Sequence, residues 1–169
     1  MKKRSNIVLK ILGILLLTTF GVVGCSSGLN EQGKTTSSSL EVLEPESWIG
    51  TELPILEHID IAEMLKEGTW LVLLYHYDCP DCIRAIAKYE QAARSLAGNE
   101  DIIRIALIAM PPYGKNPISE DCPCTVGRLA PTKDWFVAAP AFALLADGKV
   151  KAASEGRAPD LAAIIEKIT

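Results

Sequence analysis

Two nearly continuous apolar runs, Trp70–Tyr75 and Ile105–Met110, are the clearest pattern in the chain. Short runs of this kind, without polar alternation, are typical of strands that are covered on both faces of a parallel sheet. Between them, Pro80–Ala97 places apolar residues at helical spacing and ends at Gly98. The pattern therefore predicts a strand, a helix and a second, parallel strand.

Shorter patterns complete the predicted domain. Asp60 and Glu63 form a capping box for a short helix that Gly68 ends, and Asp147-Gly148 is a hairpin signal. The further predicted elements are an extended segment Trp48–Pro54, a helix Ile61–Glu67, a partly helical stretch within Thr125–Phe136, strands Ala141–Ala146 and Lys149–Ser154, and a helix Pro159–Ile168. This order predicts an α/β fold, a mixed sheet with helices on both faces.

The N-terminus has the pattern of a secretory signal peptide, with a basic start, an apolar run and small residues before Cys25. Val22-Val23-Gly24-Cys25 resembles the bacterial lipobox, in which the cysteine is lipidated and becomes the first residue of the mature protein. An uncleaved membrane anchor is the alternative. Residues 26–47 are rich in Ser, Thr, Gly and Glu, which is typical of a disordered tether.

These signals divide the chain into a lipoprotein signal peptide (1–24), a lipidated cysteine with its tether (25–47) and a folded domain (48–169). We expect the domain to be exported, held on a bacterial membrane and facing the periplasm or the cell exterior. The net charge is −4, and the basic cluster of the signal peptide is cut away. Nucleic acid is therefore excluded as a partner.

The sequence WLVLLYHYDCPDC joins the first apolar run to Cys79 and Cys82. Pro80 fits the first position of a helix, so Cys79 stands at the helix terminus and Cys82 one turn further in. The partial positive charge of that terminus favours a thiolate on Cys79. The pair is a candidate redox dithiol; half of a zinc site and a permanent disulfide are the alternatives.

Two acidic residues, Asp78 and Asp81, flank Cys79 and oppose the effect of the helix terminus on its thiolate. A less stable thiolate makes a dithiol more reducing. The sequence therefore favours a reductant, or an isomerase-like role, over a strong oxidant.

A second pair, Cys122 and Cys124, lies in a proline-rich loop after Met110. Because the carboxyl ends of parallel strands share one edge, this loop is predicted to approach Cys79. Three interpretations are open: a strained local disulfide, a second dithiol that exchanges electrons with Cys79 and Cys82, or a copper or zinc site formed with those residues and His76.

From Trp48 to Thr169 the sequence resembles the thioredoxin superfamily, especially its exported, membrane-tethered TlpA, ResA and DsbE members. The resemblance rests on Cys79-Pro80-Asp81-Cys82 after an apolar strand, on Ala139-Pro140-Ala141-Phe142, and on the hairpin Leu144–Val150. It implies a three-layer thioredoxin-like fold. It also implies that Cys79 is the exposed nucleophile and Cys82 the shielded resolving thiol, that Pro140 is cis and faces them, and that the Ala139 backbone pairs with the substrate.

Three positions depart from the family pattern. Asp78 stands where a Trp is usual, Leu73 stands where thioredoxin has a buried Asp, and Ala141 replaces a Thr. These departures leave the exchange chemistry possible and affect its rate and redox potential. Of Tyr75 and Tyr77, one is expected in the core and the other, Tyr77, near the substrate.

The sequence thus predicts a membrane-anchored thiol–disulfide oxidoreductase that exchanges disulfides with protein substrates and is recharged by a membrane redox partner. It needs no cofactor and no metal. The alternative is a non-catalytic lipoprotein that binds or delivers copper or zinc through its two cysteine pairs.

Overall fold

The computed structural model describes residues 39–98 and 103–168, with side chains described up to Ile165. Its centre is a five-stranded sheet in the order β4-β3-β2-β6-β7. The strands are β2 (Thr69–Tyr75), β3 (Arg104–Ala109), β4 (Thr125–Arg128), β6 (Ala141–Ala146) and β7 (Lys149–Ser154). The first three in chain order run parallel, whereas β6 is antiparallel to β2 and β7 is antiparallel to β6.

The central strand β2 is buried along nearly its whole length. Its side chains alternate between the two faces of the sheet, as the pleat requires. Trp70, Val72 and Leu74 enter one core, and Leu71, Leu73 and Tyr75 enter the other. This double burial explains the unbroken apolar run, and it confirms the predicted parallel pairing of β2 with β3.

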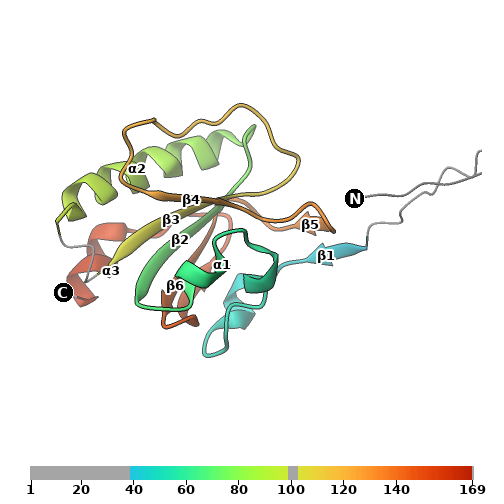
Figure 1. The fold of residues 1–169 in the computed structure, drawn as a ribbon, viewed down its shortest axis with the longest axis horizontal. Coiled ribbons are helices and arrows are strands. Elements are labelled where there is room, and N and C mark those ends of the chain that lie inside the picture. The colour runs from blue at the N-terminus through green and yellow to red at the C-terminus, as the bar shows by residue number, and fades with distance from the viewer. Residues whose placement is uncertain (1–38, 99–102, 169) are drawn as a thin grey trace, which may run out of the picture. The chain divides into compact units, whose positions relative to one another are not determined.

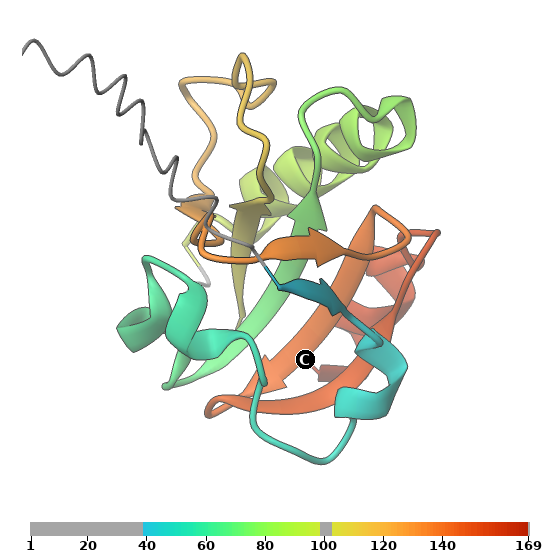
Figure 2. The ribbon, with the colours of Figure 1, turned by 90° about the vertical axis from the view of Figure 1, so that its right-hand side faces the viewer.

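Helices cover both faces of the sheet (Figure 1). One face carries α2 (Pro80–Leu96) and α3 (Leu161–Ile168). The other carries α1 (Ala62–Leu65), the 3₁₀ helices η1 (Pro45–Trp48) and η2 (Leu56–His58), and a small parallel ribbon of β1 (Leu40–Val42) and β5 (Asp134–Phe136). Figure 2 shows this ribbon lying across the sheet. The predicted α/β class with a mixed sheet is confirmed.

The predicted hairpin strands Ala141–Ala146 and Lys149–Ser154 are confirmed with their bounds unchanged, and the helix after Cys79 ends within one residue of its expected end. The partly helical stretch within Thr125–Phe136 is wrong, because those residues form β4 and β5. β4 is held in extended form by parallel pairing with β3. Long-range pairing of this kind has no local sequence signal.

The capping box of Asp60 and Glu63 is also wrong. Helix α1 begins after Ile61 without a side-chain cap, and Asp60 Oδ1 instead accepts a hydrogen bond from the backbone N–H of Arg128 at 2.7 Å. The Asp60 N–H donates to the Arg128 carbonyl oxygen at 3.1 Å. Asp60 therefore fixes the end of β4.

The folded domain begins earlier than residue 48. β1 pairs in parallel with β5, and the Leu43 side chain is 5% exposed, so residues 40–47 belong to the domain and not to a disordered tether. The predicted signal peptide, Cys25 and the rest of the tether lie outside the described residues. Within the described ranges, every helix is too short or too polar to cross a lipid bilayer.

A test of the fold lies at Gly127 in β4. A Cβ added there would lie 2.8 Å from Asp60 Oδ1, 2.8 Å from Ile61 Cγ1 and 2.9 Å from Ile108 Cδ1. We expect Gly127→Ala to lower the free energy of unfolding by about 1–3 kcal/mol in urea titrations, because this overpacking must displace the side chains of Asp60, Ile61 and Ile108. The neighbouring exposed Val126→Ala should change it by less than about 0.5 kcal/mol. Equal stability of the two variants would contradict this packing.

Candidate active site

Cys79 is the N-cap residue of α2, in extended conformation with Pro80 in the first turn. Its Sγ accepts a hydrogen bond from the backbone N–H of Cys82 at 3.1 Å. An N-cap acceptor satisfies one of the free N–H groups that every helix start leaves, and it places the sulfur in the positive end of the helix dipole. The same residue thus begins the helix and presents a partly exposed thiol.

Cys82 is fully buried against β2 and α2 core residues, with 0% of its surface exposed. The pKa of its thiol is raised to about 12, chiefly by burial and then by its hydrogen bond to the Cys79 side chain, whereas the His76 backbone acts in the opposite direction. Both cysteines are free thiols in this structure. The dithiol therefore has one accessible sulfur and one shielded sulfur.

The segment before β6 faces Cys79 from the other side. The Ala139–Pro140 peptide bond is cis, and the Ala139 carbonyl oxygen lies 3.8 Å from Cys79 Sγ, where it accepts a hydrogen bond from the thiol. Pro140 is buried. The structure thus brings Cys79, Cys82, Ala139 and Pro140 together, as the sequence predicted.

An aromatic group lies on the loop side of this centre. Tyr75 is fully buried in the core, while Tyr77 is half-buried and contacts the rings of both Tyr75 and Tyr113, at centroid distances of 5.5 and 6.4 Å. The division between a core tyrosine and a second one nearer the surface is therefore confirmed. Tyr113 belongs to the loop after β3, so the start of that loop does stay near the active-site edge.

In the part of the chain that the structure describes, no carboxylate lies in the core beside Cys82. Leu73 is fully buried in the core that contains Cys82. Among the described residues, the one buried charged side chain is Glu90, two helical turns further along α2. The resolving thiol must therefore lose its proton without a neighbouring buried carboxylate as the base.

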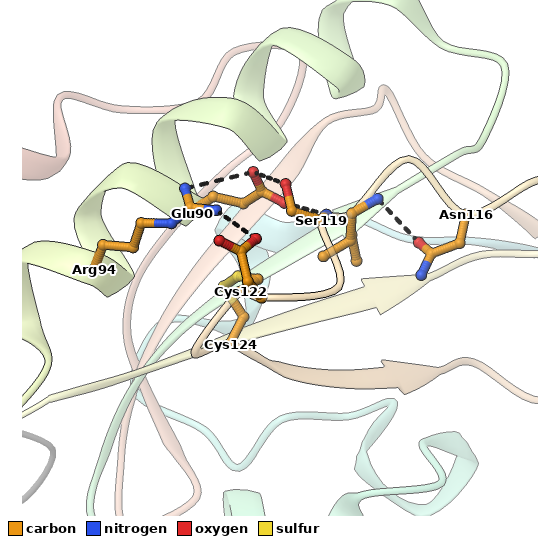
Figure 3. The surroundings of a disulfide bond; sticks show 8 residues. Glu90, Arg94, Asn116, Ser119, Cys122 and Cys124 are labelled. Atoms are coloured by element: carbon orange, nitrogen blue, oxygen red, sulfur yellow. Dashed lines mark hydrogen bonds and ion pairs between the residues drawn. A yellow bond between two sulfur atoms is a disulfide. The ribbon is translucent and has the colours of Figure 1, made fainter.

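The Cys122–Cys124 pair forms a disulfide with an S–S distance of 2.09 Å. Figure 3 shows it beside the second half of α2. Ser119 donates hydrogen bonds from its N–H and hydroxyl to the Glu90 carboxylate at 2.6 and 2.9 Å, and Arg94 pairs with Asp121 at 3.2 Å. The loop before β4 is therefore fastened to α2.

The prediction that this pair reaches the active-site edge is wrong. The loop runs back along α2 (Figure 1) because β4 is parallel to β3. The chain must therefore return to the edge of the sheet at which β3 begins before β4 can start. Glu90 lies eight residues after Cys82, or about 12 Å along a helix. In this arrangement Cys122 and Cys124 cannot exchange directly with Cys79 of the same molecule, nor share a metal with it. In the described part of the chain, no three metal-ligating side chains converge.

Sequence reasoning missed Glu90 as a fastening point, although a signal was present. Glu90 stands four residues after Ile86 and three before Ala93, on the apolar stripe of α2. A lone carboxylate on a buried stripe indicates a specific partner, because an unpaired buried charge is costly. The partner, Ser119, lies in a loop without periodicity and could not be named from the sequence.

The two aromatic residues of β5 and the histidine before Cys79 differ in burial. Trp135 packs in the core, with its indole N–H donating to the Ala130 carbonyl oxygen at 2.7 Å. Phe136, the next residue, is 61% exposed, because the two residues point to opposite sides of β5. His76 is half-buried, and its carbonyl accepts a long hydrogen bond of 3.5 Å from the Cys79 N–H.

No protein-family profile matches the sequence, and no curated protein sequence matches it significantly. Solved structures do resemble it. The thioredoxin domain of a thiol-disulfide oxidoreductase from Bacteroides vulgatus has 20% identity and a TM-score of 0.48, covering 63% of this chain and 84% of that one. An exposed lipoprotein thioredoxin from Streptococcus pneumoniae has 15% identity and a TM-score of 0.45, covering 63% and 87%. StoA from Bacillus subtilis has 13% identity and a TM-score of 0.43, covering 60% and 82%.

The chain's own topology defines the class. The sheet order β4-β3-β2-β6-β7, a CxxC pair at the start of the helix that follows the central strand, and a cis-proline directly before β6 are together the features of a thioredoxin-like fold. The fold that the sequence resemblance implied is confirmed.

The difference between the two thiols can be tested by alkylation. Because the pKa of Cys82 is about 12, only about one molecule in ten thousand carries its thiolate at pH 8. We expect iodoacetamide to modify Cys79 alone in the folded, reduced protein, and both cysteines after unfolding. Peptide mass spectrometry locates the label. Equal labelling of Cys79 and Cys82 in the folded protein would contradict the shielding.

Proposed function

We propose that the protein is a thiol–disulfide oxidoreductase that exchanges disulfides with protein substrates through Cys79 and Cys82. The observation that carries the proposal is the geometry of Cys79: a partly exposed sulfur that caps α2, accepts the Cys82 N–H at 3.1 Å and contacts the Ala139 carbonyl at 3.8 Å. An accessible thiol at a helix N-terminus next to a shielded partner is the arrangement that exchange requires.

In the first step, the Cys79 thiolate attacks one sulfur of a substrate disulfide. A mixed disulfide forms between Cys79 and that sulfur, and the other substrate sulfur leaves as a thiolate. The Cys82 N–H, which donates to Cys79 Sγ in the dithiol state, stabilises negative charge on that sulfur before the attack. The incoming substrate chain lies beside Ala139, and we assign the Ala139 backbone to pairing with it. We assign the Tyr77 side chain to contact with the same substrate chain.

In the second step, Cys82 loses its proton and attacks Cys79 Sγ, which releases the second substrate thiol and leaves a Cys79–Cys82 disulfide. Two of the causes that raise the Cys82 pKa, its hydrogen bond to Cys79 and the charge of Cys79, disappear once Cys79 is in the mixed disulfide. The pKa of Cys82 therefore falls at the step in which its thiolate is needed. Burial is unchanged and keeps solution thiols away.

We further propose that the domain works outside the cytoplasm, on a lipid anchor at Cys25, and that a membrane redox partner restores its dithiol. The signal pattern and the lipobox-like Val22–Cys25 support this placement. A pair of thiols that acts on protein disulfides also suits a compartment in which disulfides persist.

The proposed direction is reduction of the substrate. Cys82 has a raised pKa, and the two charged neighbours of the pair in sequence are Asp78 and Asp81. Both features disfavour a thiolate in the reduced protein, and a reduced form without that stabilisation is a stronger reductant.

The exchange mechanism can be tested by trapping. We expect Cys82→Ser to accumulate a mixed disulfide with a protein substrate such as insulin, since the resolving thiol is absent, whereas Cys79→Ser forms none and loses insulin reduction. Non-reducing electrophoresis and mass spectrometry show the adduct. As a control, the double variant Cys122→Ser/Cys124→Ser should retain at least about half of the activity, because that pair lies apart from Cys79. Trapping through Cys122 or Cys124 would refute the assignment.

The direction of electron flow can be tested by equilibrium with glutathione or dithiothreitol buffers. We expect a reduction potential closer to the value of about −270 mV found for thioredoxin than to about −120 mV for DsbA. Tryptic mapping separates the Cys79–Cys82 couple from the Cys122–Cys124 couple. A potential near the oxidising end of that range would show that the protein donates disulfides instead.

A further inference from the structure

Beside the active site, two hollows run along the same side of the domain and join. The first, of about 360 Å³, is lined by Pro140, Asp81, Arg84, Lys88 and Arg157, together with small residues of α2 and of the segment after β7. The second, of about 920 Å³, lies between α2 and α3 and shares Lys88 and Ala158 with the first. We call the two together the α2–α3 groove. It begins at Pro140 and leads away from Cys79.

The part of the groove next to Pro140 is cationic. Arg84, Lys88 and Arg157 line it, and one carboxylate, Asp81, lies among them and pairs with Arg84. Lys88 and Arg157 have no carboxylate within ion-pair distance in the described part of the chain. Two unpaired cations thus stand together at the active site of a protein with a net charge of −4.

Two further carboxylates near the groove accept backbone hydrogen bonds, and one of them, Asp160, lines the second hollow. Glu155 accepts a hydrogen bond from the Ala138 N–H at 3.3 Å, and Asp160 accepts one from the Ala162 N–H at 3.1 Å, at the start of α3. Gly156 N–H donates to the Ala138 carbonyl oxygen at 2.6 Å, which holds the backbone before Arg157 against the segment that leads to Pro140. The backbone that carries Arg157 is therefore held beside Pro140.

The far part of the groove is mainly apolar. Its lining includes Ala92, Leu161, Ala162 and Ile165. Gln91 and Ser95 of α2 and Asp160, directly before α3, line it as well. From Arg84 to Ser95 the helix extends about 16 Å, which equals about five residues of extended chain.

We propose that the α2–α3 groove binds the chain of the substrate protein beyond its reactive cysteine, and that it selects an extended segment with acidic residues next to the cysteine followed by apolar residues. This inference rests on the proposed exchange function and names its substrate class. Carboxylates of the bound chain meet Lys88 and Arg157, and apolar side chains cover Leu161 and Ile165. Charge complementarity of this kind favours encounter and register with the correct partner.

The test uses synthetic peptides with one cysteine held as a mixed disulfide with glutathione. One set has Glu-Glu-Leu-Leu beside the cysteine and the other Lys-Lys-Leu-Leu, each placed before or after it. Of the two acidic peptides, the one that is reduced faster shows the preferred placement. We expect the full domain to reduce this peptide with a kcat/KM about three- to tenfold higher than the basic peptide of the same placement. Raising the salt concentration from about 0.02 to 0.5 M should shrink this ratio.

The double variant Lys88→Gln/Arg157→Gln should bring the acidic-to-basic ratio close to one. The matched control is Lys149→Gln/Lys151→Gln, which removes the same charge from two exposed lysines of β7 that line neither hollow. Because the readout is a ratio for one protein preparation, a partly unfolded variant does not mimic the effect. Reduction of a small neutral disulfide by the Lys149→Gln/Lys151→Gln control should equal that by the unchanged protein.

The outcomes are distinct. Equal rates with acidic and basic peptides, or a preference that the β7 control loses as completely as the groove variant, overturn the groove assignment and leave the exchange function standing. Failure to reduce any peptide or the small disulfide overturns the exchange function and this inference with it.

Discussion

The hydrogen bond from the Cys82 N–H to Cys79 Sγ is the contact on which the site depends. It exists because β2 ends at Tyr75 and α2 begins directly after Cys79, so the chain's own turn sets the distance between the two residues. One interaction caps the helix and orients the sulfur, and it also links the two thiols electrostatically. A change in where β2 stops would remove all three effects together.

Helix α2 keeps the free dithiol apart from the disulfide. Its start carries the free dithiol, and its second half carries Glu90 and Arg94, which hold the loop that contains the Cys122–Cys124 disulfide. The loop can form this fastening because β4 must be entered from the edge opposite to the active site. Parallel topology therefore keeps the disulfide out of reach of Cys79, and it leaves the Cys79 face open for a foreign chain.

The parts that sequence reasoning predicted well depend on local patterns or on continuous burial. In three cases a few neighbouring residues determine the local structure. These are the apolar runs, the Asp147-Gly148 turn and the Cys79–Cys82 spacing. The parts that it missed depend on distant contacts. Asp60 has the signature of a helix cap but bonds Arg128, 68 residues away, and β1 is defined by its pairing with β5. No pattern within Thr125–Phe136 reveals which strands these residues pair with.

Net charge is likewise a property of the whole sequence that does not reveal which residues the fold brings together at a functional site. From the overall value of −4 we expect no nucleic-acid partner, yet that value gives no information about the sign of the charge at one place on the surface. Arg84 and Lys88 are one helical turn apart on α2, and Arg157 joins them only after the chain has passed through five further strands. Screening limits each of these charges to about 10 Å. A chain entering beside Pro140 therefore meets Lys88, Arg157 and the Arg84–Asp81 pair, and hardly senses the acidic residues elsewhere in the domain.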